Sequence, residues 1–240
     1  MSDPRLLIIQ TGSVAEPVLR VHGDYPSWFM RELGFETPVI RAHEGEKLGE
    51  VRFDGIIVTG SPLSVTERAP WMEELGQRLL DLGRKGTPVL GVCFGHQLLA
   101  RAAGGEVSLT PHGREIGSIK VQLTAAGAKD PLFSWTRGPV PIEEIDCQAT
   151  HVDAVDALPP GATLLAGNEN TPVQAYRLSE TIAAVQFHPE IDAATMREII
   201  ASRGERLQGE GLDAQALAAQ VRDTPAAAIL RAFAAQASRA

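Results

Sequence analysis

Three short apolar runs, each ending in turn-forming residues, constrain the fold more than any other feature of this chain. They lie at Arg5–Gln10, Gly55–Gly60 and 87–92. Continuous hydrophobicity over so few residues is typical of strands buried on both faces, as in a parallel sheet. Between the runs, residues 27–33 and 69–86 repeat apolar side chains every three or four positions, as helices do. Strands that alternate with helices through short connections predict an α/β fold with a mostly parallel sheet.

The character of the chain changes after Gly105. In the later strand candidates apolar and polar residues alternate more, and glycine and proline separate the strands. Both features favour an antiparallel extension of the sheet. The strand candidates are residues 115–123, 140–149, 162–168, 172–178 and 182–187, and helical patterns follow at 192–202, at 213–221 and from Thr224.

The last helical pattern has a clear start signal. Thr224 is its expected N-cap and Pro225 its first residue. Its expected buried stripe is Ile229, Leu230 and Phe233. No stretch of the chain has the composition of a linker. We therefore expect one domain over residues 1–240, with a core of about 5–203 and a C-terminal helical extension of about 211–240.

Composition and charge narrow the class of protein. A formal net charge of −8 argues against binding to nucleic acid or to acidic membranes, because both need a basic surface. No apolar run resembles a signal peptide or is long enough to span a bilayer. Cys93 and Cys147 are too few for a disulfide framework, and no Cys/His cluster has the spacing of a zinc site. We expect a soluble cytoplasmic protein whose thiols stay reduced.

Cys93 stands where the third apolar run passes into a helical pattern, between Gly91 and Gly95. A nucleophile elbow has this form, because a sharp turn exposes the nucleophile and small neighbours avoid collision with the adjoining strand and helix. Positive charge at the helix N-terminus favours a thiolate, and the amide of Phe94 points to where an oxyanion forms. A buried cysteine that only packs under the helix is the alternative.

His188 and Glu190 are the candidate base and its orienting group. A cysteine nucleophile needs a base, and His188 ends another buried run, where the loops of such sheets place functional groups. Residues i and i+2 of an extended chain point the same way, so we expect the Glu190 carboxylate beside the imidazole. Gly60 is either a second oxyanion donor or an ordinary strand-ending turn. Together with the elbow, these residues favour a Cys-His-Glu triad.

The segments GVCFGHQ, VQFHPE and TGSPLSV resemble the three signature segments of the class I, or triad, glutamine amidotransferases. The resemblance extends from the first apolar run to about residue 200, and the Cys and His-x-Glu segments together are highly specific. It implies a flavodoxin-like, mostly parallel central sheet with helices on both faces. It also implies a reaction in which Cys93 attacks the side-chain amide of glutamine, ammonia leaves, and water hydrolyses a γ-glutamyl thioester.

The resemblance implies a role for each residue of the proposed triad and oxyanion hole. His188 acts as general base and then as the acid that protonates ammonia, and Glu190 orients it. Gly60 and Phe94 provide the oxyanion-hole amides. No metal and no organic cofactor is implied.

Three further residues match segments that hold the substrate in the family. Gln97 matches the glutamine that contacts the amino-acid end of the substrate. Thr150 and His151 lie in QATHVDAV, which resembles the segment that holds the α-groups. For His151 the alternative is a solvated loop histidine. The other four histidines, His22, His43, His96 and His112, are expected to be non-catalytic.

The residues leave three functions open. The first is a glutaminase that releases ammonia for a separate ATP-dependent synthetase, because no phosphate-binding loop is present in this chain. The second is a stand-alone hydrolase or transferase of γ-glutamyl peptides or amides, because the segment Pro111–Val121 and the helical tail resemble the free-standing relatives in this family, including its γ-glutamyl peptidase-like group. The third is a redox-sensing or protective protein that uses the elbow cysteine, which Glu190 argues against. The aromatic segment Val21–Phe29 is either a lid over the site or part of the core.

Overall fold

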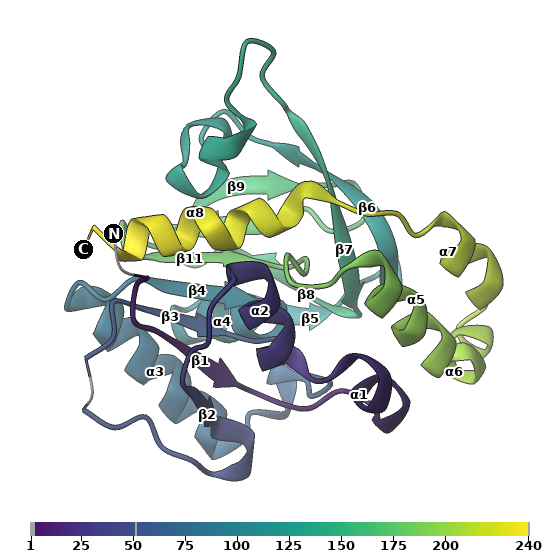
Figure 1. Cartoon of the computed structure of the whole chain (residues 1–240), viewed down its shortest axis with the longest axis horizontal. Helices are drawn as coiled ribbons and strands as arrows, with labels where there is room; N and C mark the ends of the chain where they lie inside the picture. Colours follow the sequence, from purple (N-terminus) through teal and green to yellow (C-terminus); the bar gives the residue numbers. More distant parts are fainter. Residues whose placement is uncertain (1–2, 51, 240) are drawn as a thin grey trace.

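A nine-stranded mixed sheet forms the centre of the computed structural model, which describes residues 3–50 and 52–239 (Figure 1). In sequence order its strands are β1 (Leu6–Gln10), β2 (Val39–Arg41), β3 (Gly55–Val58), β4 (Val89–Val92), β6 (Glu115–Leu123), β7 (Glu144–His151), β9 (Thr163–Gly167), β10 (Ala175–Arg177) and β11 (Ile182–Val185). Their spatial order is β2-β1-β3-β4-β11-β10-β9-β6-β7. The block from β2 to β11 is parallel, and the strands beyond β11 are antiparallel. The expected parallel sheet and its antiparallel extension are both confirmed.

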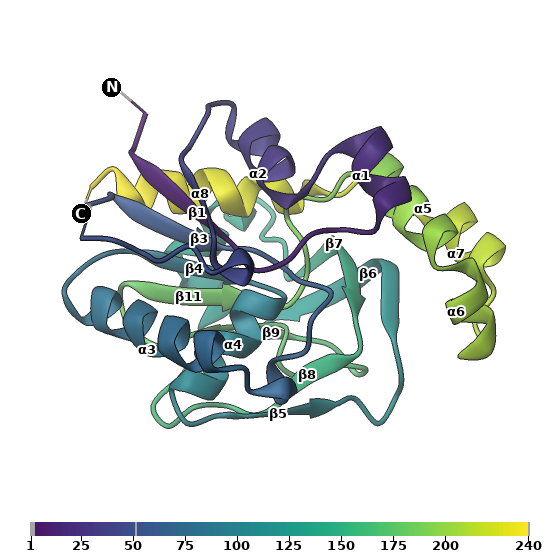
Figure 2. The same ribbon diagram turned by 90° about the horizontal axis from the view of Figure 1, so that it is seen from below.

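Helices cover both faces of this sheet (Figure 2). They are α1 (Glu16–His22), α2 (Tyr25–Leu33), α3 (Pro70–Arg84), α4 (Phe94–Ala102), α5 (Ala193–Ser202), α6 (Gly204–Gly209), α7 (Ala214–Gln220) and α8 (Ala228–Ala237). Short 3-10 turns lie at Ala42–Glu44, Val65–Glu67, Gly127–Lys129, Pro131–Thr136 and Pro225–Ala227. Outside the large sheet, β5 (Glu106–Leu109) pairs antiparallel with β8 (Asp153–Ala157).

Strand β1 shows why the sequence is continuously apolar from Leu6 to Ile9. Leu6 and Ile8 lie in the core that packs under α2, α5 and α8, whereas Leu7 and Ile9 lie in the core under α3 and α4. Both faces of the strand are therefore buried, and alternation with polar residues is excluded. Trp28 and Phe29 of α2 are fully buried as well, so this part of the aromatic segment belongs to the core.

The C-terminal helix differs in detail from the expectation. Residues 225–227 form a 3-10 turn and α8 begins at Ala228, while the Thr224 side chain makes no capping hydrogen bond. The predicted stripe of Ile229, Leu230 and Phe233 is buried against the sheet. Helix α8 thus covers a large part of one sheet face (Figure 1).

Five elements were not predicted: α1, β2, β5, β8 and α6. Each is short, and β2 and β5 are partly or largely exposed, so no buried stripe marks them in the sequence. The expected strand at 140–149 begins only at Glu144 and continues to His151, because Val140 and Ile142 lie in an exposed loop.

The parallel block places three loops side by side. Strands β3, β4 and β11 are neighbours in register, with Val58 opposite Gly91 and Val92 opposite Val185. Their carboxyl ends lead directly to Gly60, Cys93 and His188. Loops at the carboxyl ends of parallel strands are where α/β folds form their sites. Within the described ranges, no helix is both long and apolar enough to cross a bilayer.

Candidate active site

Cys93 has a strained backbone at the junction of β4 and α4. Its φ is 51° and its ψ is −100°, and it occupies the N-cap position of α4. A residue other than glycine rarely adopts a positive φ, so the surrounding structure must hold Cys93 in this conformation. The amide of Cys93 donates to the Val185 carbonyl at 2.9 Å, and the amide of Gly95 donates to the Thr59 carbonyl at 3.2 Å. These bonds fix the elbow to the strands on both sides of it.

The glycines beside Cys93 are required by close contacts. A Cβ on Gly91 would lie 2.6 Å from the carbonyl oxygen of Gly95, and a Cβ on Gly95 would lie 2.6 Å from that of Val58. Both distances are shorter than van der Waals contact, so helix α4 approaches the sheet at this point only because both residues are glycine. The geometry is that of a nucleophile elbow.

His188 and Glu190 form a fully buried pair. The Nδ1 atom of His188 lies 2.6 Å from Oε1 of Glu190, and the two side chains are 1% and 0% exposed. The His188 amide donates to the carbonyl of Gln148 in β7 at 2.8 Å. Arg31 of α2 donates to the backbone carbonyl of Glu190 at 3.2 Å and pairs with Asp192 at 3.1 Å. The loop after β11 is therefore held from two sides.

The electrostatics of the pair favour a charged imidazole. Burial by itself lowers the pKa of His188, but the charges of Glu190 and Cys93 outweigh it and raise the pKa to about 10. The Nε2 atom of His188 is buried and has no hydrogen-bond partner among the described residues. The ring of Tyr25 stacks on His188 at a centroid distance of 6.4 Å. The free nitrogen is therefore available to a reacting group.

Gly60 lies against both reactive side chains. A Cβ on Gly60 would stand 2.7 Å from Cε1 of His188 and 3.6 Å from Cβ of Cys93. The three loops thus converge on one point, as the strand order requires. The amides of Gly60 and Phe94 donate to no other backbone carbonyl or side chain in the described part of the chain. Both donors remain available beside the thiol.

A cleft of about 340 Å³ opens at Cys93 and contains the other predicted residues. Gln97 is buried in its wall, and its Nε2 donates to the Asp153 carbonyl at 2.8 Å and to Gln186 Oε1 at 3.0 Å. The carboxylate of Asp153 accepts a hydrogen bond from Ser64. Gln97 therefore helps to hold the β8 side of the cleft in place.

His151 is a buried residue of β7 and not a solvated loop histidine, so that alternative is wrong. Its Nε2 lies 3.0 Å from Glu115 and its Nδ1 lies 3.1 Å from the Asp153 carbonyl. Burial opposes ionisation of Glu115, but hydrogen bonds from His151, Asn168 and Gln174 hold the pKa of this carboxyl below its usual value. Glu115 thereby orients a residue that lines the cleft.

Three arginines complete the lining of the cleft, and the sequence analysis did not identify them as site residues. They are Arg114, which directly precedes β6, and Arg203 and Arg206 of the α5–α6 segment. Arg203, the residue between α5 and α6, donates to the hydroxyl of Thr150. Arg114 and Arg206 both pair with Glu210. No sequence pattern marks Arg203 and Arg206, because helical tails commonly carry arginine on their solvent side. Arg114 precedes β6 in the segment Pro111–Val121, where no pattern distinguishes it from its neighbours.

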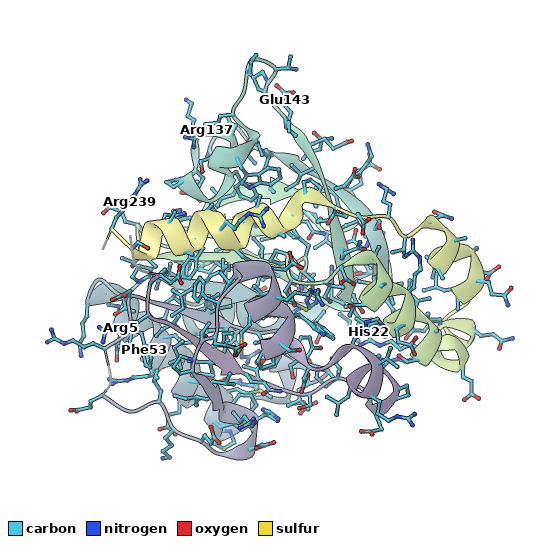
Figure 3. The ribbon with its side chains drawn as sticks, viewed as in Figure 1. Arg5, His22, Phe53, Arg137, Glu143 and Arg239 are labelled. Carbon is cyan, nitrogen blue, oxygen red and sulfur yellow. The ribbon has the colours of Figure 1, made fainter. Side chains whose placement is uncertain are left out.

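The remaining histidines and Cys147 lie outside this cleft. His22 ends α1 beside α5, 3.4 Å from the Thr195 hydroxyl (Figure 3). Burial lowers the pKa of His96 to about 3 and raises that of the Cys147 thiol well above its usual value, so both stay neutral in the core. His43 contacts the Gln10 carbonyl and His112 is exposed. Among residues 3–50 and 52–239, no group of three His, Cys, Asp or Glu side chains could hold a metal ion.

A larger cavity of about 660 Å³ lies elsewhere, lined by Arg5 and Phe53 (Figure 3). It adjoins the amino ends of β1, β3 and β4, whereas Cys93 follows the carboxyl end of β4. Its described lining residues include no cysteine or histidine, whereas the cleft at Cys93 is equipped for nucleophilic chemistry.

Comparisons with known proteins agree with this geometry. The family model of the class-I glutamine amidotransferases matches residues 29–204. Gamma-glutamyl peptidase 3 of Arabidopsis thaliana is 28% identical over 78% of this chain and 76% of its own length. The GMP synthase of Marinobacter nauticus is 34% identical over 79% of this chain, which spans only 34% of that enzyme. A crystal structure of a glutamine amidotransferase from Thermotoga maritima, 22% identical, superposes with a TM-score of 0.76 over the whole of both chains.

The contacts of the elbow predict a stability effect. Replacing Gly95 with alanine is expected to reduce the free energy of unfolding by about 1–3 kcal/mol, because the new methyl group must displace α4 from Val58. Gly209→Ala is the matched control, since nothing lies within 4 Å of its Cβ position. Urea denaturation measures both variants. Equal stability of the two variants would contradict the close approach.

Proposed function

Because this chain belongs to the class I glutamine amidotransferase family, we propose that it is an enzyme that hydrolyses a γ-glutamyl amide bond through Cys93, His188 and Glu190. The observation that carries the proposal is the convergence of three strand ends. It brings a strained cysteine, a buried His–Glu pair and two available backbone amides to one point. A cysteine that only packs in the core needs neither the strain nor the buried pair.

The first half of the reaction forms a thioester. The Cys93 thiolate attacks the Cδ carbonyl of the substrate, and the carbonyl oxygen becomes negatively charged. The amides of Gly60 and Phe94 stabilise this oxyanion. The C–N bond then breaks as the His188 imidazolium gives its proton to the departing nitrogen. Neutral His188 and a γ-glutamyl thioester on Cys93 remain.

The second half regenerates the enzyme. His188 takes a proton from water, whose oxygen adds to the thioester carbonyl. Collapse of this intermediate expels the Cys93 thiolate and releases glutamate, and the thiolate–imidazolium pair is restored. Glu190 keeps Nδ1 of His188 engaged throughout, so that Nε2 carries the moving proton.

Glutamine is the simplest substrate for this chemistry, with its ammonia passed to a separate ATP-dependent synthetase. The name of the GMP synthase relative, glutamine-hydrolyzing, supports this form of the proposal. The reaction takes place in the cytoplasm, where a catalytic thiol stays reduced. The second candidate, hydrolysis of γ-glutamyl peptides, is favoured by the similarity over three quarters of a gamma-glutamyl peptidase.

Loss of the thiol tests the proposal directly. Cys93→Ala is expected to abolish glutamate release from glutamine and from γ-glutamyl-p-nitroanilide, because no other group forms the thioester. Cys147→Ala removes a thiol that lies in the core and is expected to keep its activity. Steady-state assays of glutamate release compare the two. Full activity of Cys93→Ala would disprove the assigned nucleophile.

The raised pKa of His188 predicts a pH effect. His188 must be protonated in the active ion pair, so activity is present below its pKa and is lost as the pH rises toward about 10. Glu190→Gln removes the negative charge that stabilises the imidazolium. The alkaline limb of the kcat/KM profile is therefore expected to move to lower pH, by about 1 unit or more.

The control for this pH effect makes the same chemical change far from the site. Glu143 lies on the exposed loop that ends in β7 (Figure 3), and Glu143→Gln is expected to leave the profile unchanged. An alkaline limb that does not move in Glu190→Gln would contradict the role of the buried pair.

A further inference from the structure

Two fully buried threonines join the ends of β1 and β3 beside Gly60. Thr11 directly follows β1 and Thr59 directly follows β3. The amide of Thr11 donates to the Thr59 hydroxyl at 3.1 Å, and the Ser61 hydroxyl donates to the Thr11 carbonyl at 2.8 Å. Side chains therefore tie the two strand ends together, in addition to the backbone bond from the Thr59 amide to the Ile9 carbonyl.

The two threonine hydroxyls have two protons to donate, and two backbone carbonyls lie within their reach. The Thr59 hydroxyl is 2.9 Å from the Gly60 carbonyl oxygen, and the Thr11 hydroxyl is 3.0 Å from the Thr59 carbonyl oxygen. The Thr11 hydroxyl also lies 3.1 Å from the Gly60 oxygen and 3.3 Å from the Thr59 hydroxyl. Each hydroxyl donates only one proton. Because the Thr59 hydroxyl serves Gly60, we assign the proton of Thr11 to its nearest acceptor, the Thr59 carbonyl.

The Thr59 carbonyl is held by two donors from different elements. Besides the Thr11 hydroxyl, it accepts from the amide of Gly95 at 3.2 Å. The Gly95 bond comes from α4 and the Thr11 bond comes from the end of β1. One hydrogen bond leaves a peptide able to turn about it, whereas two donors on the same oxygen restrict that rotation. The peptide between Thr59 and Gly60 is therefore fixed against both the helix and the sheet.

That peptide carries the Gly60 amide of the proposed oxyanion hole. Its carbonyl belongs to Thr59 and its N–H to Gly60, and in a planar trans peptide the two point in opposite directions. Holding the carbonyl therefore also sets the direction of the Gly60 N–H. This N–H donates to no backbone carbonyl or side chain of the described residues, although Gly60 lies against Cys93 and His188. A donor without a partner of its own keeps its direction only through the rest of its peptide.

We propose that Thr11 is a positioning residue of the oxyanion hole, whose hydroxyl holds the Thr59–Gly60 peptide so that the Gly60 N–H meets the oxygen of the tetrahedral intermediate. This inference rests on the proposed function, because that oxyanion forms only when Cys93 attacks a carbonyl. Thr11 is buried beneath the site and acts through the peptide alone. A donor that is aligned in advance stabilises the transition state without reorganisation. Thr11 therefore serves the rate of the chemical step and not the binding of the substrate.

The first test removes the hydroxyl and keeps the branched shape of the side chain. Thr11→Val is expected to lower kcat for γ-glutamyl-p-nitroanilide about 10- to 100-fold, because a misdirected donor stabilises the oxyanion less. Thr11→Ser restores a hydroxyl and is expected to return kcat to within about threefold of the wild type. In the Cys93→Ala chain, which cannot form the oxyanion, Thr11→Val is expected to leave the Kd of glutamine unchanged.

The matched control makes the same substitution at another fully buried threonine. Thr171 lies between β9 and β10, and its hydroxyl has no hydrogen-bond partner in the described part of the chain. Thr171→Val is therefore expected to keep the wild-type kcat. A wild-type kcat in Thr11→Val would overturn the proposal. So would a Thr11→Ser variant that is no faster than Thr11→Val, or a loss of glutamine binding that accounts for the whole effect.

The second test separates positioning of the oxyanion hole from damage to the elbow. Iodoacetamide alkylates a thiolate by displacing iodide from a saturated carbon, so no charge develops on a carbonyl oxygen and no oxyanion hole is needed. Thr11→Val is expected to be alkylated at Cys93 at the wild-type rate, although its kcat has fallen. An equal loss of both rates would overturn the proposal, since it would show that Thr11 only supports the position of Cys93.

The same measurements keep this inference distinct from the proposed function. If the wild-type chain released no glutamate from glutamine or from γ-glutamyl-p-nitroanilide, the proposed function would be wrong and the role of Thr11 would fall with it. Turnover by the wild type that Thr11→Val leaves intact would refute the role of Thr11 alone.

Discussion

The positive φ of Cys93 is the constraint on which the rest of the site depends. Such a backbone costs on the order of 1–3 kcal/mol, and it persists only where neighbouring structure enforces it. Here the enforcing contacts come from both adjacent strands, through Val185 of β11 and Thr59 after β3. The same strands end at His188 and Gly60. The strain at the nucleophile and the position of its partners are therefore set by one piece of sheet.

Burial of the His188–Glu190 pair gives the site its charge balance. A carboxylate without a partner is costly in the core, so Glu190 favours a protonated imidazole beside it. That proton is what the departing nitrogen requires. Helix α2 closes this region, with Tyr25 over the imidazole ring and Arg31 on the backbone of Glu190. A helix from the beginning of the chain thus orders a loop near its end.

Much of the site could be predicted from the sequence because its parts end buried strands. Gly60, Cys93 and His188 follow continuous apolar runs, and the spacing of His188 and Glu190 predicts neighbouring side chains. The structure brings these residues together, and it also places Gln97, Thr150 and His151 in the walls of the cleft.

The residues that sequence reasoning missed act across distances that no local pattern reveals. Glu115 reaches His151 through the pairing of β6 with β7, and Arg203 reaches Thr150 from a helical tail. His151 illustrates the same limit. Its polar neighbours in the sequence suggest a loop, whereas strand pairing buries it.

Covalent labelling with 6-diazo-5-oxo-L-norleucine, a glutamine mimic with a reactive carbon near the Cδ position, tests the central claim most directly. Intact-mass measurement followed by peptide mapping would report the site and its stoichiometry. We expect one adduct per chain, on Cys93, none on Cys147, and protection by excess γ-glutamyl substrate. No adduct, or an adduct on a residue other than Cys93, would contradict the account.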